Sequence, residues 1–112
     1  MHSLRGIPLS DFRWPGGDFR DAGTLRLTPE DVEHKLGFSF ERGVDDLDYY
    51  RALGLELPSG RRVVLNWYER APEPRHLAVW ADATDDLVLA LSETLTGLGL
   101  PASAIAWQPA PN

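Results

Sequence analysis

The stretch YYRALGLELPSGRRVVLNWY, residues 49–68, decides the fold. Its first half alternates leucines with smaller or polar residues, which is typical of a β-strand with one buried face. Pro58-Ser59-Gly60 then favours a three-residue hairpin loop, because glycine readily takes the left-handed conformation that closes such a turn. The sequence therefore predicts a hairpin with strands at residues 49–57 and 61–68.

The loop length also predicts which residues face each other. With Leu57 opposite Arg61, the expected pairs are Leu55 with Val63, Leu53 with Leu65, Glu56 with Arg62, Ala52 with Asn66, and Tyr50 with Tyr68. A slip of one residue would turn the leucines to the opposite face of the sheet. Turn chemistry and hydrophobic pattern thus favour the same register, with the leucines on one face and both tyrosines on the other.

The remaining elements follow from helix signals and from alternation. Residues 28–37, TPEDVEHKLG, predict a short helix with Thr28 as its N-cap, Pro29 in its first turn and Gly37 at its end. A third strand is expected at His76–Asp82, because apolar and polar residues alternate there. Residues 85–98 show the broad apolar stripe of a longer helix, with Thr84 as the expected cap, and a last strand is expected at 104–107.

Together these elements predict an α+β fold. We expect a three-stranded antiparallel meander, a fourth strand after a long helix packed on the leucine face, and a short N-terminal helix. The expected single domain spans 1–112, with 1–27 irregular, 28–107 in the order α-β-β-β-α-β, and 108–112 as a tail. The fourth strand should run parallel to the first and third, but the pattern does not indicate which edge it joins.

Charge and composition narrow the class of function. The net charge is −6, and residues 28–48 carry −5 of it, from seven acidic residues against Lys35 and Arg42. An acidic surface disfavours nucleic acid and attracts a basic partner. The chain has no cysteine, no run of about 20 apolar residues and no N-terminal apolar run, so we expect a cytoplasmic protein without membrane association.

No motif for catalysis or for a cofactor stands out. His34 follows Glu30 by one helical turn, a spacing that could hold a metal, but a solvated charged face explains the pair more simply. Asp45, Asp46 and Asp48 lack the central glycine and final glutamate of a calcium loop. We therefore predict no catalytic residue, no metal and no cofactor.

The second face of the sheet is the candidate site, because aromatic side chains with polar tips are enriched at recognition surfaces. The predicted partner-binding residues on the sheet are Tyr50, Asn66, Tyr68, Arg70, His76 and Trp80, with Asp45, Asp46 and Asp48 as an electrostatic rim. The same face could instead be covered by residues 1–27, whose Phe12, Trp14 and Phe19 need burial.

The predicted function is a small acidic protein-binding domain of an immunity or inhibitor type, which neutralises a toxin by binding a basic protein partner. One alternative is a small enzyme or ligand-binding domain with a pocket between the aromatic sheet face and the N-terminal segment, in which His76 is the acid–base candidate. Another is a homodimer that pairs aromatic faces or an open sheet edge, with a contribution from Leu89.

Overall fold

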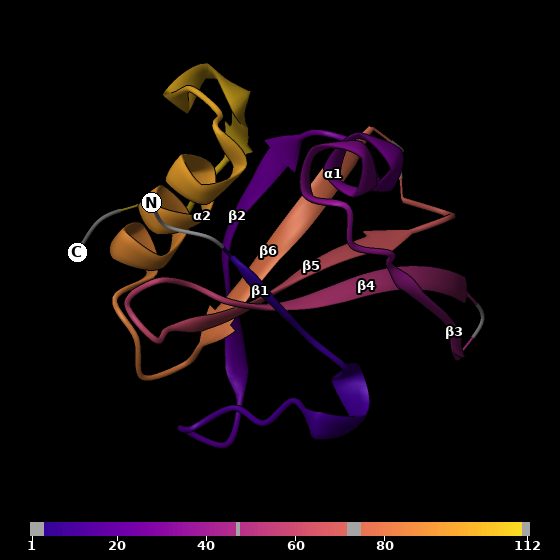
Figure 1. The fold of residues 1–112 in the computed structure, drawn as a ribbon, viewed down its shortest axis with the longest axis horizontal. Coiled ribbons are helices and arrows are strands. Elements are labelled where there is room, and N and C mark those ends of the chain that lie inside the picture. The colour runs from indigo at the N-terminus through magenta and orange to yellow at the C-terminus, as the bar shows by residue number, and fades with distance from the viewer. Residues whose placement is uncertain (1–3, 47, 72–74, 111–112) are drawn as a thin grey trace.

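The computed structural model describes residues 4–46, 48–71 and 75–110. It shows one α+β domain, in which a seven-stranded antiparallel sheet carries both α-helices on the same face (Figure 1). The strands are β1 (Arg5–Ile7), β2 (Phe19–Arg26), β3 (Glu41–Asp45), β4 (Asp48–Glu56), β5 (Arg62–Tyr68), β6 (His76–Asp82) and β7 (Ile105–Trp107). The helices are α1 (Pro29–Leu36) and α2 (Leu87–Leu98), and single 3-10 turns occur at Leu9–Asp11 and Ala102–Ala104.

The central hairpin is formed by β4 and β5, and its predicted register is confirmed. Tyr50 pairs with Tyr68, Leu53 with Leu65, and Glu56 with Arg62. Gly60 has a φ of 92°, the left-handed conformation that the loop requires, and the Leu57 N–H donates to the Arg61 carbonyl over 2.7 Å. Strand β6, predicted at His76–Asp82, is also confirmed and pairs antiparallel with β5.

The prediction of an irregular segment at residues 1–27 is wrong, and so is the four-stranded sheet. The strand order is β1-β4-β5-β6-β2-β7, and β3 also pairs with β4. Strand β2 was hidden because a bulge between Asp21 and Gly23 interrupts its alternation, so that Ala22 and Gly23 are both buried. Strand β7 pairs antiparallel with β2, and it therefore runs in the same direction as β4 and β6, as predicted.

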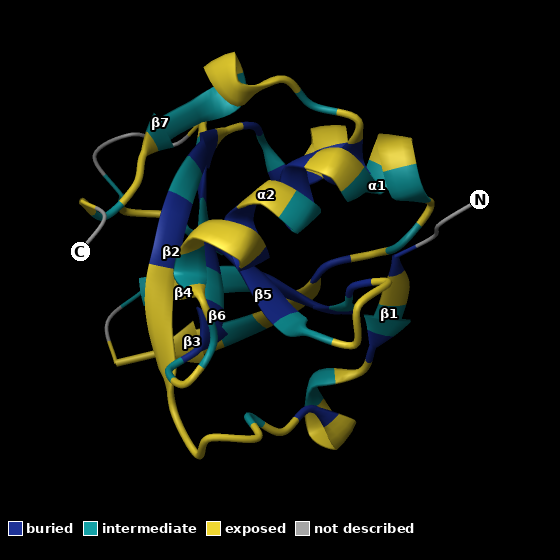
Figure 2. Ribbon diagram, turned by 90° about the vertical axis from the view of Figure 1, so that its left-hand side faces the viewer, coloured by how far each residue is buried: buried dark blue, intermediate teal, exposed yellow. Residues whose placement is uncertain are grey.

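The main core lies between the sheet and the helices. Leu25, Leu55, Leu65 and Leu77 project from four strands and are fully buried. The same core includes Leu91 of α2. Figure 2 shows buried positions gathered where the strands pass beneath α2. The leucine face thus fills the core as predicted, which leaves the opposite face of the sheet to be explained.

Helix α1 begins with a capping box that the sequence signals in part. The Thr28 hydroxyl accepts from the Asp31 N–H at 3.2 Å, and the Asp31 carboxylate accepts from the Thr28 N–H at 3.0 Å. The backbone N–H of Thr28, followed by its hydroxyl, lowers the pKa of Asp31. Gly37 ends the helix in the left-handed conformation, as predicted.

We expect Thr28→Ala to lower the free energy of unfolding by about 1 kcal/mol, because it removes the acceptor for an unpaired helix N–H. Thr28→Ser keeps that acceptor and should remain near the original stability. Urea unfolding of both variants checks this. An equal loss in the two variants would mean that the threonine methyl group, and not the cap, stabilises the helix.

Helix α2 starts two residues later than predicted, because Asp86 and not Thr84 is its cap. The Asp86 carboxylate accepts from the N–H groups of Val88 and Leu89 at 3.0 and 3.2 Å. Leu89 is 48% exposed on the outer side of this helix. Among the described residues, no helix has the length and apolar character needed to cross a membrane.

Candidate binding site

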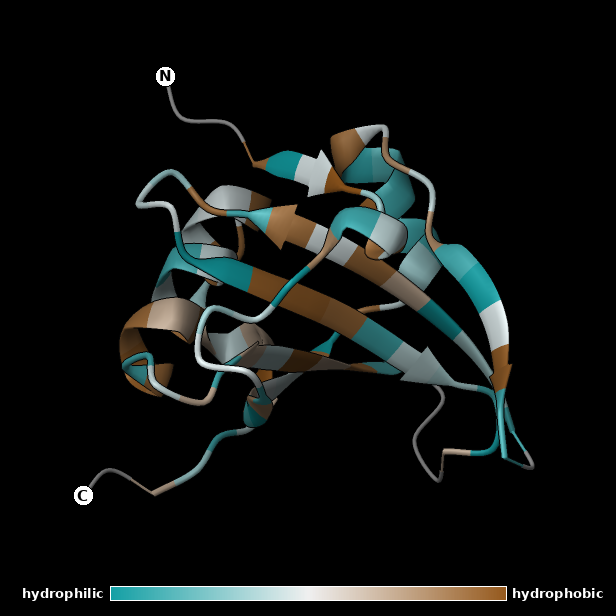
Figure 3. Cartoon of the chain, turned by 90° about the horizontal axis from the view of Figure 1, so that it is seen from below, coloured by the Kyte–Doolittle hydropathy of each residue, from teal (hydrophilic) through white to brown (hydrophobic). Residues whose placement is uncertain are grey.

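The N-terminal segment folds across the second face of the sheet and is fixed there by Asp82. Figure 3 views the molecule from the side on which residues 8–18 cross the strands. Asp82 lies at the end of β6 and is only 2% exposed. Its carboxylate accepts from the Gly16 N–H at 2.8 Å, and from the Thr84 N–H and hydroxyl at 3.3 Å each. The Gly16 bond, together with the bond from the Ala83 N–H to the Asp18 carbonyl at 3.0 Å, holds the segment against the end of the sheet.

Aromatic rings from this segment continue into the sheet as a row. Phe12 contacts Trp14 edge-on, with ring centroids 4.7 Å apart, and Trp14 lies 5.7 Å from Phe19. Phe19 in turn stacks on Trp80 of β6 at 4.4 Å. Phe12 is buried against Val64, in a second apolar cluster on this face. The segment therefore covers part of the second face, and Trp80 is only partly buried beneath it.

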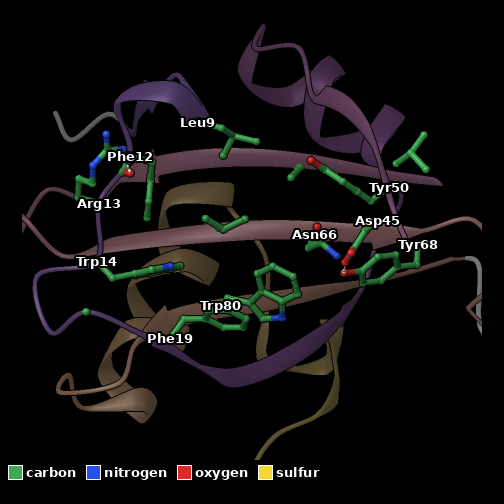
Figure 4. A pocket seen from close by; sticks show the side chains of 14 residues that line it. Leu9, Phe12, Arg13, Trp14, Phe19, Asp45, Tyr50, Asn66, Tyr68 and Trp80 are labelled. Atoms are coloured by element: carbon green, nitrogen blue, oxygen red, sulfur yellow. Dashed lines mark hydrogen bonds between the residues drawn. The ribbon is translucent and has the colours of Figure 1, made fainter. Parts of the chain in front are cut away.

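The uncovered part of this face is hollowed into an open pocket of about 690 Å³, here called the aromatic pocket (Figure 4). The sheet and the β3–β4 hairpin supply predicted residues to its wall: Asp45, Tyr50, Asn66, Tyr68 and Trp80. The N-terminal segment supplies its other wall, which includes Leu9, Phe12, Arg13, Trp14 and Phe19. The pocket thus lies where the ligand-binding alternative expects one, between the aromatic face and this segment.

One end of the aromatic pocket is polar. The Tyr68 hydroxyl donates to Oδ2 of Asp45 at 3.2 Å, and the Tyr68 ring meets Tyr50 edge-on at 6.3 Å. Asn66 is 3% exposed, and its Nδ2 has no hydrogen-bond partner among the described residues. Figure 4 shows the three side chains of Asp45, Asn66 and Tyr68 together at this end. A buried amide N–H group without a hydrogen-bond acceptor costs free energy. This end of the pocket therefore contains a donor whose hydrogen bond is still unmade.

The opposite end carries a positive charge that the sequence analysis missed. Nη1 of Arg13 donates to the carbonyl oxygens of Ser10 and Phe12 at 3.2 and 2.7 Å. These bonds hold the guanidinium beside the aromatic row, while Asp45 lies at the far side of the pocket (Figure 4). The pocket therefore has a cationic end and an anionic end.

Four predicted residues do not join the described lining. The Asp48 carboxylate accepts from the Arg70 N–H at 3.2 Å, which ties β4 to the segment after β5. Asp46 is exposed in the β3–β4 turn, with a φ of 49°. His76 pairs with Arg26 of β2 and is not among the described residues around the pocket. The enzyme alternative thus has no acid–base histidine in the described lining.

Comparison with known proteins leaves the family open. No protein-family model matches the chain, and no curated protein or solved structure is significantly similar to it. Among the described residues, no three histidine, aspartate or glutamate side chains gather closely enough to hold a metal. Function must therefore be inferred from the aromatic pocket itself.

The Tyr68–Asp45 pair leads to a prediction at alkaline pH. Burial, followed by the hydrogen bond and charge of Asp45, raises the pKa of Tyr68 above 10.0. The folded protein then holds this proton more tightly than the unfolded chain. The resulting stability is present below pH 10 and is lost as the pH rises through the folded-state pKa.

We expect Asp45→Asn to lower the pKa of Tyr68, because the neighbouring negative charge is removed. NMR of ring-labelled tyrosine over an alkaline pH series measures this, with the same series on the original protein as the reference. An unchanged Tyr68 titration would show that the carboxylate does not influence the hydroxyl in solution.

Proposed function

We propose that this chain is a cytoplasmic binding protein of the inhibitor type, and that the aromatic pocket receives a segment of a basic protein partner. One observation carries the proposal: the pocket has aromatic walls and an exposed carboxylate, Asp45, at one end. The chain around it has a net charge of −6. Aromatic side chains supply large contact area at low entropic cost, and the acidic surface accelerates association with a basic partner.

The form of the pocket supports an inserted segment. At about 690 Å³ it has room for several side chains, and it opens along the sheet between the N-terminal segment and the β3–β4 hairpin. Phe19 is 37% exposed although it stacks on Trp80, so apolar surface remains available at the pocket rim. Contact with a partner would remove that surface from water.

A small organic ligand is the second candidate, and the same volume favours it, because ligand pockets commonly span about 300–1,000 Å³. The two candidates differ in how strongly the binding affinity should depend on the negative charge of the protein. A long basic segment feels the acidic residues outside the pocket as well, and its affinity should fall with added salt. A neutral ligand held only by the pocket walls should show little dependence on salt.

The test uses the four tryptophans as reporters. Trp14 and Trp80 line the aromatic pocket, whereas Trp107 is 51% exposed on β7. Fluorotryptophan labels all four, single Trp→Phe variants assign the resonances, and arginine- and lysine-containing peptides are titrated against glutamate-containing peptides of equal length. We expect the basic peptides to shift the Trp14 and Trp80 resonances and to leave Trp107 in place. Absence of any shift, or equal shifts at Trp107, would contradict the proposal.

A matched pair of variants tests the same surface. Trp80→Ala should weaken peptide binding by about tenfold or more, since buried aromatic anchors carry much of a recognition surface's binding energy. Trp107→Ala removes the same side chain from an exposed position and should leave the affinity unchanged. Isothermal titration of both variants measures the difference. Equal losses would place binding outside the aromatic pocket.

A further inference from the structure

We infer that the polar end of the aromatic pocket is a receptor for an arginine side chain of the partner. This inference rests on the proposed function and narrows it, because it names the group that enters the pocket and the residues that hold it. These residues are Asp45, Asn66, Tyr68 and Trp80, which come from the β3–β4 hairpin and from two central strands.

Asp45 supplies the negative charge. Its Oδ2 accepts from the Tyr68 hydroxyl, and this bond fixes the carboxylate at the pocket wall although the residue is exposed. A carboxylate offers about four acceptor positions, and the tyrosine uses one of them. The remaining positions can accept N–H groups from a guanidinium, whose donors form a fork that matches a carboxylate.

The walls favour arginine over lysine. Tyr68 contacts the carboxylate, Trp80 lines the same pocket, and the aromatic rings of both are only partly buried. A guanidinium is planar and weakly hydrated, so it stacks on such rings with a smaller desolvation cost than a compact ammonium group. An aromatic pocket with one carboxylate therefore suits arginine better than lysine.

Asn66 indicates that the occupant also brings an acceptor. Its side chain is nearly fully buried in the pocket wall, and its Nδ2 has no partner among the described residues. A main-chain carbonyl next to the inserted arginine would satisfy this donor. Nδ2 is shielded from solvent, so a carbonyl can reach it only if the side chains at the polar end of the pocket move when the segment binds.

Arg13 sets the direction of the segment. It lies at the opposite end of the aromatic pocket, beside Phe12 and Trp14. A second cation at that end would be repelled, whereas a cation at the Asp45 end would be attracted. The two ends thus admit the arginine in one orientation.

The experiment compares three peptides that differ in one side chain: acetyl-Gly-Gly-Arg-Gly-Gly-amide, the same peptide with lysine, and the same peptide with citrulline. Citrulline has nearly the shape of arginine but no charge. Affinities are measured from the Trp80 fluorine resonance in the original protein, in Asp45→Asn and in Glu69→Gln. Glu69 neighbours Tyr68 in sequence and is exposed, but it is not among the described pocket-lining residues, so its variant removes the same charge outside the site.

We expect the original protein and Glu69→Gln to bind the arginine peptide about tenfold more tightly than the citrulline peptide, and more tightly than the lysine peptide. Asp45→Asn should lose the preference over citrulline. A preference that persists in Asp45→Asn, or equal losses in the two variants, would overturn the arginine receptor. Peptides that shift Trp80 without any arginine preference would overturn this inference alone, whereas absence of all shifts at Trp14 and Trp80 would overturn the proposed function.

Discussion

Replacing Asp82 with alanine should lower the free energy of unfolding by about 3 kcal/mol and detach the N-terminal segment from the sheet. The carboxylate is 2% exposed and accepts hydrogen bonds from the N–H groups of Gly16 and Thr84 and from the Thr84 hydroxyl. Its removal leaves these donors without their acceptor and releases Gly16 from the end of β6, while the Asp18 carbonyl still accepts from the Ala83 N–H. Because Trp14 lies two residues before Gly16 and lines the aromatic pocket, one wall of the pocket should open.

The matched control is Asp21→Ala, which removes the same charge from an exposed position on β2. Urea unfolding should show a large loss for Asp82→Ala and a change within about 0.5 kcal/mol for Asp21→Ala. The fluorine resonance of Trp14 should move toward the position of a solvent-exposed tryptophan only in the Asp82 variant. A Trp14 resonance that stays in place in Asp82→Ala would show that the aromatic row alone holds the segment.

The parts of the fold that were predicted correctly are those with strong local signals. The β4–β5 hairpin combines a loop that requires a left-handed glycine with an alternating leucine pattern, and both determine one register. Helix α1 has a cap, a proline and a terminal glycine at the expected positions. Such features are decided by neighbours in sequence, so they can be found without knowing the tertiary contacts.

The missed strands lack such signals. All residues of β3 are exposed or partly exposed, so the strand has no buried face, and its pairing with β4 comes from backbone hydrogen bonds. In β2 the first three residues are exposed and a bulge interrupts the alternation. Strand β2 forms because β6 and β7, which are distant in sequence, are available as partners, whereas β3 pairs with the adjacent strand β4 without a buried face that would reveal it.

The candidate site divides in the same way. Tyr50, Asn66 and Tyr68 were placed on one face by the hairpin register, and the structure brings them together in the aromatic pocket. Arg13 was missed, and the covering of this face by Phe12, Trp14 and Phe19 stayed one of two alternatives, because both depend on the contact between Gly16 and Asp82, 66 residues apart. In the sequence, Asp82 is simply a polar residue at the end of a strand.

The second large effect is expected at Gly54, where β1, β4 and the N-terminal segment meet. A Cβ at this position would lie 2.7 Å from the Ile7 carbonyl oxygen and 2.8 Å from a Phe12 ring carbon. Real contacts of this kind are essentially never so short, and the carbonyl belongs to the backbone of the paired strand β1. Gly54→Ala should therefore lower the free energy of unfolding by about 2 kcal/mol, as overpacking in a core does.

Gly6→Ala is the matched control, because Gly6 lies on β1 one residue before the partner of Gly54. Its added Cβ would meet the Phe38 ring at 3.7 Å, an ordinary contact. This variant should be neutral or more stable by up to about 1 kcal/mol, since alanine has fewer unfolded conformations to lose. Thermal and urea unfolding measure both variants. If Gly54→Ala proved as stable as Gly6→Ala, then Phe12 and β1 would not be packed against β4 in solution, and the N-terminal wall of the aromatic pocket would have no support.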